Sequence, residues 1–253
     1  MAARKNNRGR RRNRGRFGFL YVLLSFLLII AALVAGSVVF FRVDDISVSG
    51  QVRYTQEEII AAAQVQKGDN LFCISPPRTA QRITAALPYV RDVSIRHDLP
   101  DGLVILITES QAAASIQGPD GWFLLDARGK LVELGPELFK SKAAPVTGIT
   151  PLTPTVGTPL AVAQEEQAKL DALTGLLTAL EAHDMLDDLT SVDLTASNTV
   201  SFGFADRFTA KVPMSCDFDY KVRSLEYVVG ELEENETGLI DLTMSDETHF
   251  IPY

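Results

Sequence analysis

One uninterrupted apolar stretch divides the chain, and it consists of residues 17–41, with the sequence FGFLYVLLSFLLIIAALVAGSVVFF. These 25 residues include no Asp, Glu, Lys, Arg or His, and Arg16 and Arg42 bound them. As a helix the stretch extends roughly 38 Å, whereas the hydrocarbon core of a bilayer is about 30 Å thick. A helix also pairs its own backbone N–H and C=O groups, which lipid requires. The stretch therefore predicts one transmembrane helix between a short tail, residues 1–16, and a large remainder.

A cleaved signal peptide is the alternative interpretation, because the start of the chain is basic and Ala35 and Gly36 are small. The apolar region of a signal peptide is usually about 7–15 residues long, so the longer stretch favours an uncleaved anchor. Ala32 and Gly36 are four residues apart, as are Ala31 and Ala35. This spacing lets two helices approach closely and would give weak self-association, although ordinary span composition explains it equally.

The basic and acidic residues are separated along the chain. The tail holds eight of the 24 basic residues and none of the 32 acidic ones. Positive charge beside a span stays in the cytoplasm, so we predict a single-pass type II protein of the plasma membrane with residues 42–253 outside the cytoplasm. Arg/Gly repeats such as Arg8-Gly9-Arg10 can coat nucleic acid, but here they adjoin the span and suit anionic lipid. The acidic remainder would repel nucleic acid, and we predict no nucleic-acid partner.

Local signals predict the order strand, helix, helix, strand, strand over residues 44–109. Thr55 and Glu58 form a capping box that begins the first helix. Ser75 precedes Pro76 and another proline, a pattern typical of a helix start. Alternating residues and a Pro-Asp-Gly turn at 100–102 predict two paired strands. The two helices must cover one face of a three-stranded sheet, because neither alone could bury its apolar side.

The remainder, residues 111–253, is predicted to be a mixed, β-rich domain with packed helices, so the whole chain belongs to the α+β class. A long Pro-rich connection over 135–160 interrupts it, and the strand near its middle is short. Residues 238–244 place Ile240, Leu242 and Met244 on one face of a final strand. The expected strands are 122–125, 131–134, 146–149, 200–204, 208–212 and 238–244, and the expected helices are 163–182 and 218–232.

Catalytic and metal-binding patterns are missing from the sequence. Cys73 lies in an apolar run, and two buried thiols, Cys73 and Cys216, are a better interpretation than a disulfide between them. The three histidines stand apart, with no metal-ligand spacing. No nucleophile elbow, phosphate loop or zinc-protease motif occurs. We therefore predict no enzyme activity, no cofactor and no metal.

Six segments of the sequence, and Glu109 after the third strand, form a recognisable set. The segments are Val48-Ser49-Gly50, Thr55-Gln56-Glu57-Glu58-Ile59, Gly68-Asp69-Asn70-Leu71-Phe72, Leu87-Pro88-Tyr89-Val90-Arg91-Asp92-Val93, Pro100-Asp101-Gly102-Leu103 and Gly121-Trp122-Phe123-Leu124-Leu125-Asp126-Ala127-Arg128-Gly129. Together they resemble the FtsQ/DivIB family of bacterial cell-division proteins. The resemblance assigns residues 43–110 to a POTRA domain and residues 111–253 to a second, β domain.

The resemblance implies a membrane scaffold at the division septum that links FtsL-like and FtsB/DivIC-like partners and helps control septal peptidoglycan synthesis. It places partner binding toward the C-terminus, where an edge strand could accept a partner strand. Ordinary terminal packing or fraying is the alternative for these residues. Two other functions stay open: a membrane-tethered POTRA-type module that handles exported proteins, and an unrecognised cell-wall enzyme. The predicted partner-binding residues are Thr243, Met244, Thr248, Phe250 and Tyr253.

Overall fold

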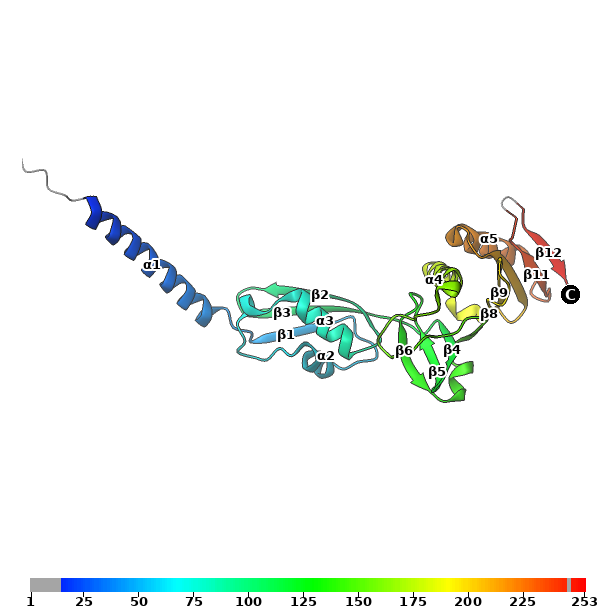
Figure 1. Ribbon diagram of the computed structural model, residues 1–253, viewed down its shortest axis with the longest axis horizontal. Helices are drawn as coiled ribbons and strands as arrows, with labels where there is room; N and C mark the ends of the chain where they lie inside the picture. Colours follow the sequence, from blue (N-terminus) through cyan, green and yellow to red (C-terminus); the bar gives the residue numbers. More distant parts are fainter. Residues whose placement is uncertain (1–14, 245–246) are drawn as a thin grey trace, which may run out of the picture.

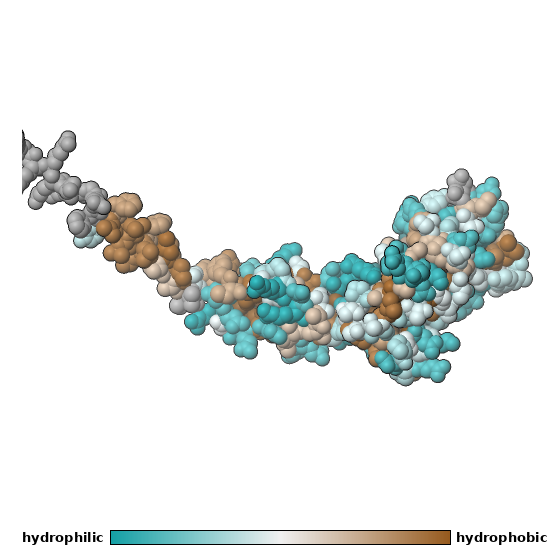
Figure 2. Space-filling model, in the orientation of Figure 1, coloured by the Kyte–Doolittle hydropathy of each residue, from teal (hydrophilic) through white to brown (hydrophobic). Residues whose placement is uncertain are grey.

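The computed structural model describes residues 15–244 and 247–253, as an apolar helix followed by two packed units (Figure 1). The basic residues up to Arg14, and the prediction made from them, lie outside the described residues. Helix α1 (Gly15–Phe40) covers the predicted span, and its segment Gly18–Ser37 is long and apolar enough to cross a membrane. All large apolar side chains from Phe19 to Val34 are at least 44% exposed, so no other part of the described chain buries this helix. Figure 2 shows α1 as a continuous apolar surface, in contrast to the largely polar units beyond it.

The first unit has the predicted strand and helix order, and we call it the POTRA domain. Strand β3 lies between the other two strands, parallel to β1 and antiparallel to β2. Thr55 and Glu58 form the predicted capping box at the start of α2. Leu103 and Ile105 of β3 are fully buried beneath the helices. Its elements are β1 (Asp45–Ser49), α2 (Gln56–Ala63), α3 (Pro76–Ala86), β2 (Val90–Asp98) and β3 (Gly102–Glu109).

The second unit, which we call the β domain, is built on one mixed sheet of nine strands. The strand order is β12-β11-β10-β9-β8-β7-β4-β5-β6, so β12 and β6 are its two edges. Helices α4 and α5 pack on one face of this sheet and share its core (Figure 1). The elements are β4 (Ala114–Gly118), β5 (Gly121–Leu125), β6 (Leu131–Gly135), β7 (Ala144–Thr147), α4 (Gln167–Ala182), β8 (Leu189–Asp193), β9 (Thr199–Phe204), β10 (Phe208–Pro213), α5 (Phe218–Glu231), β11 (Gly238–Asp241) and β12 (His249–Pro252).

The α+β class is confirmed, but three local expectations need correction. Strands β4, β8 and β12 were not expected, because each is held by pairing with strands that are distant in sequence or across a turn. Cys73 is exposed rather than buried, because Leu71–Cys73 forms a short 3-10 helix that buries only Leu71. Strand β11, expected over 238–244, ends at Asp241, so Met244 is 56% exposed and does not share the buried face of Ile240.

The carboxylate of Glu109 ties the end of β3 to the loop after β1. It accepts hydrogen bonds from the backbone N–H groups of Val52, Arg53 and Tyr54, at 3.1, 2.8 and 3.3 Å. Three donors lose their partner if the carboxylate is removed, and hydrogen bonds to a charged group contribute more than neutral ones.

We expect Glu109→Ala to lower the free energy of unfolding by about 1–3 kcal/mol, and Glu109→Gln, which keeps one acceptor oxygen, to lower it by less. Denaturant unfolding of the full chain in detergent measures both. Equal stability of Glu109→Ala and the wild-type chain would contradict this role of the carboxylate.

The two domains contact each other through an apolar cluster with polar groups around it. Tyr89 of the POTRA domain is 5% exposed and packs with Leu124 and Val132 of the β domain. Its hydroxyl donates to Glu133 Oε2 at 2.5 Å. Arg91 pairs with Glu181 of α4 at 2.7 Å. These contacts make the junction a packed interface rather than a bare linker.

Candidate partner-binding edge

Strand β12 forms a free edge of the nine-stranded sheet, since in the described ranges 15–244 and 247–253 it pairs with β11 alone. The N–H of Tyr253 donates to the carbonyl of Thr237 at 3.0 Å. Hydrogen-bonded and non-hydrogen-bonded pairs alternate along an antiparallel ladder. Ile251, two residues before Tyr253, therefore also directs its backbone N–H and C=O toward β11. Phe250 lies between these two residues, so its N–H and C=O face away from the sheet. Such outward groups are the template on which a further strand can pair.

Thr243 and Met244 lie on the segment that leaves β11. The hydroxyl and the N–H of Thr243 both donate to Asp241 Oδ1, at 2.7 and 2.9 Å. These bonds from Thr243 lower the pKa of the Asp241 carboxyl. The carbonyl of Met244 accepts a hydrogen bond from the Lys221 ammonium. Thr243 thus stabilises its own turn, while the Met244 side chain is free to contact a partner.

The other three predicted residues belong to β12 or flank it. Thr248 is exposed and Tyr253 is 79% exposed. The ring of Phe250 is half-buried and meets Phe208 edge-to-face, with centroids 6.2 Å apart. Phe250 therefore fastens the strand to the core, while its outward backbone and the side chains of its neighbours stay available. The pairing of β11 with β12 brings the predicted residues into one region of the surface.

Sequence reasoning missed two parts of this surface. Ile251, opposite Leu239 in the register, is 51% exposed on the sheet face that lacks helices. A shallow cavity of about 450 Å³ lies between Thr248 and α5, and its walls include Tyr220 and Tyr227. Those tyrosines are seven residues apart, a helical spacing that places them on one face and could have identified this cavity.

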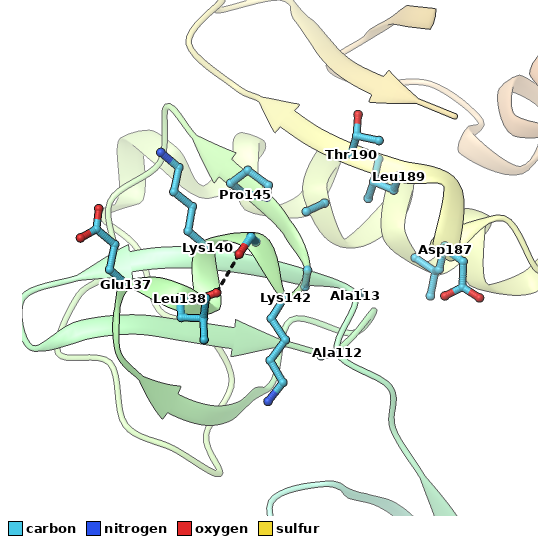
Figure 3. A pocket seen from close by; sticks show the side chains of 14 residues that line it. Ala112, Ala113, Glu137, Leu138, Lys140, Lys142, Pro145, Asp187, Leu189 and Thr190 are labelled. Carbon is cyan, nitrogen blue, oxygen red and sulfur yellow. Dashed lines mark hydrogen bonds between the residues drawn. The ribbon is translucent and has the colours of Figure 1, made fainter. Parts of the chain in front are cut away.

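A larger cavity, about 810 Å³, lies elsewhere in the β domain, beside η2 (Glu137–Ser141) (Figure 3). Lys140 and Asp187 bring opposite charges to its walls, and the Ser141 hydroxyl donates to the carbonyl of Leu138 at 3.0 Å. Its lining contains no histidine or cysteine that could activate that hydroxyl. Among the residues that the structure describes, no group of His, Cys, Asp and Glu could hold a metal ion.

Comparison with known proteins gives one family and several relatives. The family model described as "POTRA domain, FtsQ-type" matches residues 41–110. The chain is 26% identical over 156 residues to cell division protein DivIB of Clostridium acetobutylicum, and this match covers 62% of this chain and 61% of that protein. It is 28% identical over 160 residues to cell division protein FtsQ of Corynebacterium glutamicum, and this match covers 62% of this chain and 64% of that protein.

A longer match extends over both domains. The chain is 22% identical over 235 residues to cell division protein DivIB of Clostridium botulinum, and this match covers 92% of this chain and 90% of that protein. The two shorter matches span somewhat over three fifths of their relatives' length. The β-α-α-β-β order after an apolar helix and the match of residues 41–110 identify an FtsQ-type POTRA domain, and over both domains the chain is similar to bacterial cell-division proteins of the FtsQ/DivIB family.

Proposed function

We propose that the chain is a single-pass membrane scaffold of the bacterial division apparatus. Its relatives carry the names cell division protein DivIB and cell division protein FtsQ, and α1 is suited by length and composition to a membrane. The basic tail keeps the N-terminus in the cytoplasm, and residues 42–253 lie outside it, at the septum. There the β domain links FtsL-like and FtsB/DivIC-like partners and helps control septal peptidoglycan synthesis, without catalysis of its own.

The free edge of β12 is the observation that carries this proposal. An extended partner segment pairs with the outward N–H and C=O of Phe250 and continues the sheet. The side chains of the added strand alternate between the two faces of the sheet. On one face they meet Thr248 and the cavity beside α5, and on the other they meet Ile251 and Tyr253. Backbone pairing supplies affinity, and these side-chain contacts supply selectivity.

A substitution pair at Phe250 tests the edge itself. Phe250→Ala and Phe250→Pro both remove the ring, but only proline removes the outward N–H and places its own ring where a partner strand would lie. We expect Phe250→Pro to bind the FtsL-like and FtsB/DivIC-like pair at least about tenfold more weakly than Phe250→Ala. Titration of the purified partner pair onto the detergent-solubilised full chain measures the difference. Equal affinities of the two variants would contradict strand addition at this edge.

The POTRA domain also has a free edge, strand β2, which favours the alternative function. Strand β2 has only β3 as a neighbour in the portion of the chain that the structure describes. A module that handles exported proteins could use it in the same way. Ile95→Pro, compared with Ile95→Ala, removes the outward N–H at the middle of β2 and distinguishes the functions. We expect it to leave binding of the division partners unchanged, whereas a POTRA-type module would lose its client.

A further inference from the structure

The end of α1 is joined to a loop of the POTRA domain as well as to the following strand. The side-chain amide of Asn70 donates to the carbonyl of Ser37 at 3.2 Å. The backbone N–H of Leu71 donates to the carbonyl of Phe41 at 2.9 Å, and that of Val43 donates to the carbonyl of Asp69 at 2.8 Å. Residues 69–71 are therefore held against the segment that leaves the helix.

This connection sets the depth of the loop relative to a bilayer. The span Gly18–Ser37 has 20 residues, and at 1.5 Å per residue it covers about 30 Å, the thickness of the hydrocarbon core. Ser37 then lies at the boundary of that core. The headgroup region extends about 5–8 Å further on each side. Because two residues span at most about 7 Å, Phe72 lies within reach of this region when Asn70 contacts Ser37.

The loop presents an aromatic side chain at this depth. The ring of Phe72 is 58% exposed. It packs edge-to-face against the ring of Phe41, with centroids 4.9 Å apart. The Asn70 side chain also accepts a hydrogen bond from the N–H of Phe72 at 2.9 Å, which fixes the turn that carries this ring. An exposed phenylalanine is unfavourable in water, whereas apolar and aromatic groups are accommodated at a membrane interface.

A second turn of the POTRA domain lies at the same end. The N–H of Asp44, a few residues beyond the span, donates to the carbonyl of Asp101 at 2.9 Å. Leu99, two residues before Asp101, is 56% exposed. Exposed large apolar side chains are thus present on two separate loops at the end of the domain that joins α1.

We propose that Phe72, supported by Phe41, inserts into the headgroup interface of the leaflet that faces residues 42–253, so that the loop after α2 is a lipid-contacting surface. The ligand is the bilayer interface itself. The contact gives the POTRA domain a second attachment point to the membrane besides α1. Two attachment points restrict the tilt of the domain relative to the membrane more than one does. The proposal rests on α1 spanning the membrane, as in the function proposed above.

Tryptophan depth measurements test this contact. The chain has one tryptophan, so the Trp122→Phe background allows a single tryptophan to be placed at a chosen site. Phe72→Trp reports the proposed contact. Val52→Trp is the matched control, because Val52 is 92% exposed and lies beside Glu109, at the far end of the POTRA sheet. Phe26→Trp, in the middle of α1, reports the span. Each full-length variant is reconstituted in phosphatidylcholine vesicles whose acyl chains are unbrominated, brominated near the headgroup, or brominated near their methyl ends.

We expect bromination near the headgroup to reduce the emission of Phe72→Trp, and bromination near the chain ends to reduce that of Phe26→Trp, each by roughly twofold or more, and both to leave Val52→Trp unchanged. If Phe26→Trp is quenched while Phe72→Trp behaves like Val52→Trp, the lipid contact is wrong and the span stands. If neither Phe26→Trp nor Phe72→Trp is quenched, both the span and the contact are wrong. Near-ultraviolet circular dichroism of each variant in detergent confirms that the domains remain folded.

Discussion

Removal of residues 243–253, by truncation after Leu242, is expected to abolish capture of the FtsL-like and FtsB/DivIC-like partners by the full-length chain. The truncation deletes β12, and with it the outward backbone of Phe250 and the exposed side chains of Ile251 and Tyr253. Because it removes the complete edge rather than one contact, we expect at least about a hundredfold loss of affinity. Co-purification from membranes measures partner capture, and a fluorescent fusion measures septal placement.

The truncated chain should remain folded. Strand β11 still pairs with β10, and Leu242, which is 1% exposed, keeps its place in the core. Lys140→Ala combined with Lys142→Ala, at the cavity beside η2, is a control that changes a different part of the surface. It should bind partners normally. If the truncated chain co-purified with partners and reached the septum as the wild type does, the assignment of this edge would be refuted.

Tyr89→Ala is expected to have the largest effect on stability, with a loss of about 3–5 kcal/mol. It removes a nearly buried aromatic ring from the cluster between the domains, where Tyr89 contacts Leu124 and Val132. The guanidinium of Arg53 lies 3.8 Å above that ring, so its cation–π contact is lost as well. Because this cluster couples the two domains, we expect one thermal unfolding transition in the wild type to become two in the variant.

Tyr89→Phe is the matched control for this substitution. It keeps the ring and removes only the hydroxyl that donates to Glu133, and Glu133 is exposed enough to bind water instead. We expect a loss of about 0.5–1.5 kcal/mol and a single unfolding transition. If Tyr89→Ala unfolded in one transition with little loss of stability, the interface would not couple the domains.

Acid should weaken the same interface. The hydrogen bond from Tyr89 is the main cause that lowers the pKa of the Glu133 carboxyl. A carboxyl with a lowered folded-state pKa contributes stability above its unfolded pKa, and this contribution is lost as the pH falls through the folded value. We expect the stability of the wild type to decrease more between pH 6 and 3 than that of Tyr89→Phe, and thermal unfolding at several pH values measures this. Equal decreases would show that the hydrogen bond adds nothing to the acid response.

Local sequence signals explain why the order and type of the strands and helices in the POTRA domain could be predicted. Its capping box at Thr55 and its turn at residues 99–102 are signals contained in a few neighbouring residues. The order of the nine-stranded sheet has no such signal. Strand β4 pairs in parallel with β7 across about thirty residues, and β10 pairs in parallel with β11 around α5. Loop closure and packing decide these partners.

The sequence indicated the region of the candidate edge but not the strand that forms it. The resemblance directed attention to the C-terminal residues, yet HFIP, the sequence of β12, is four residues long and contains a proline. Nothing local distinguishes it from a frayed end. Its pairing with β11, and the packing of Phe250 on Phe208, make it a strand. The hydrogen bonds from Thr243 to Asp241 show that Thr243 stabilises its own turn, which residue spacing alone could not distinguish from partner binding.

Hydrogen exchange at the backbone amide of Phe250 tests the central claim most directly. The full-length chain in nanodiscs is compared with and without the purified FtsL-like and FtsB/DivIC-like partners. If a partner strand is added to β12, the outward N–H of Phe250 becomes hydrogen-bonded, and its exchange should slow by at least about tenfold. Strand β6, at the opposite edge of the sheet, should exchange as before. Unchanged exchange at Phe250 in a complex that has demonstrably formed would contradict partner binding along this edge.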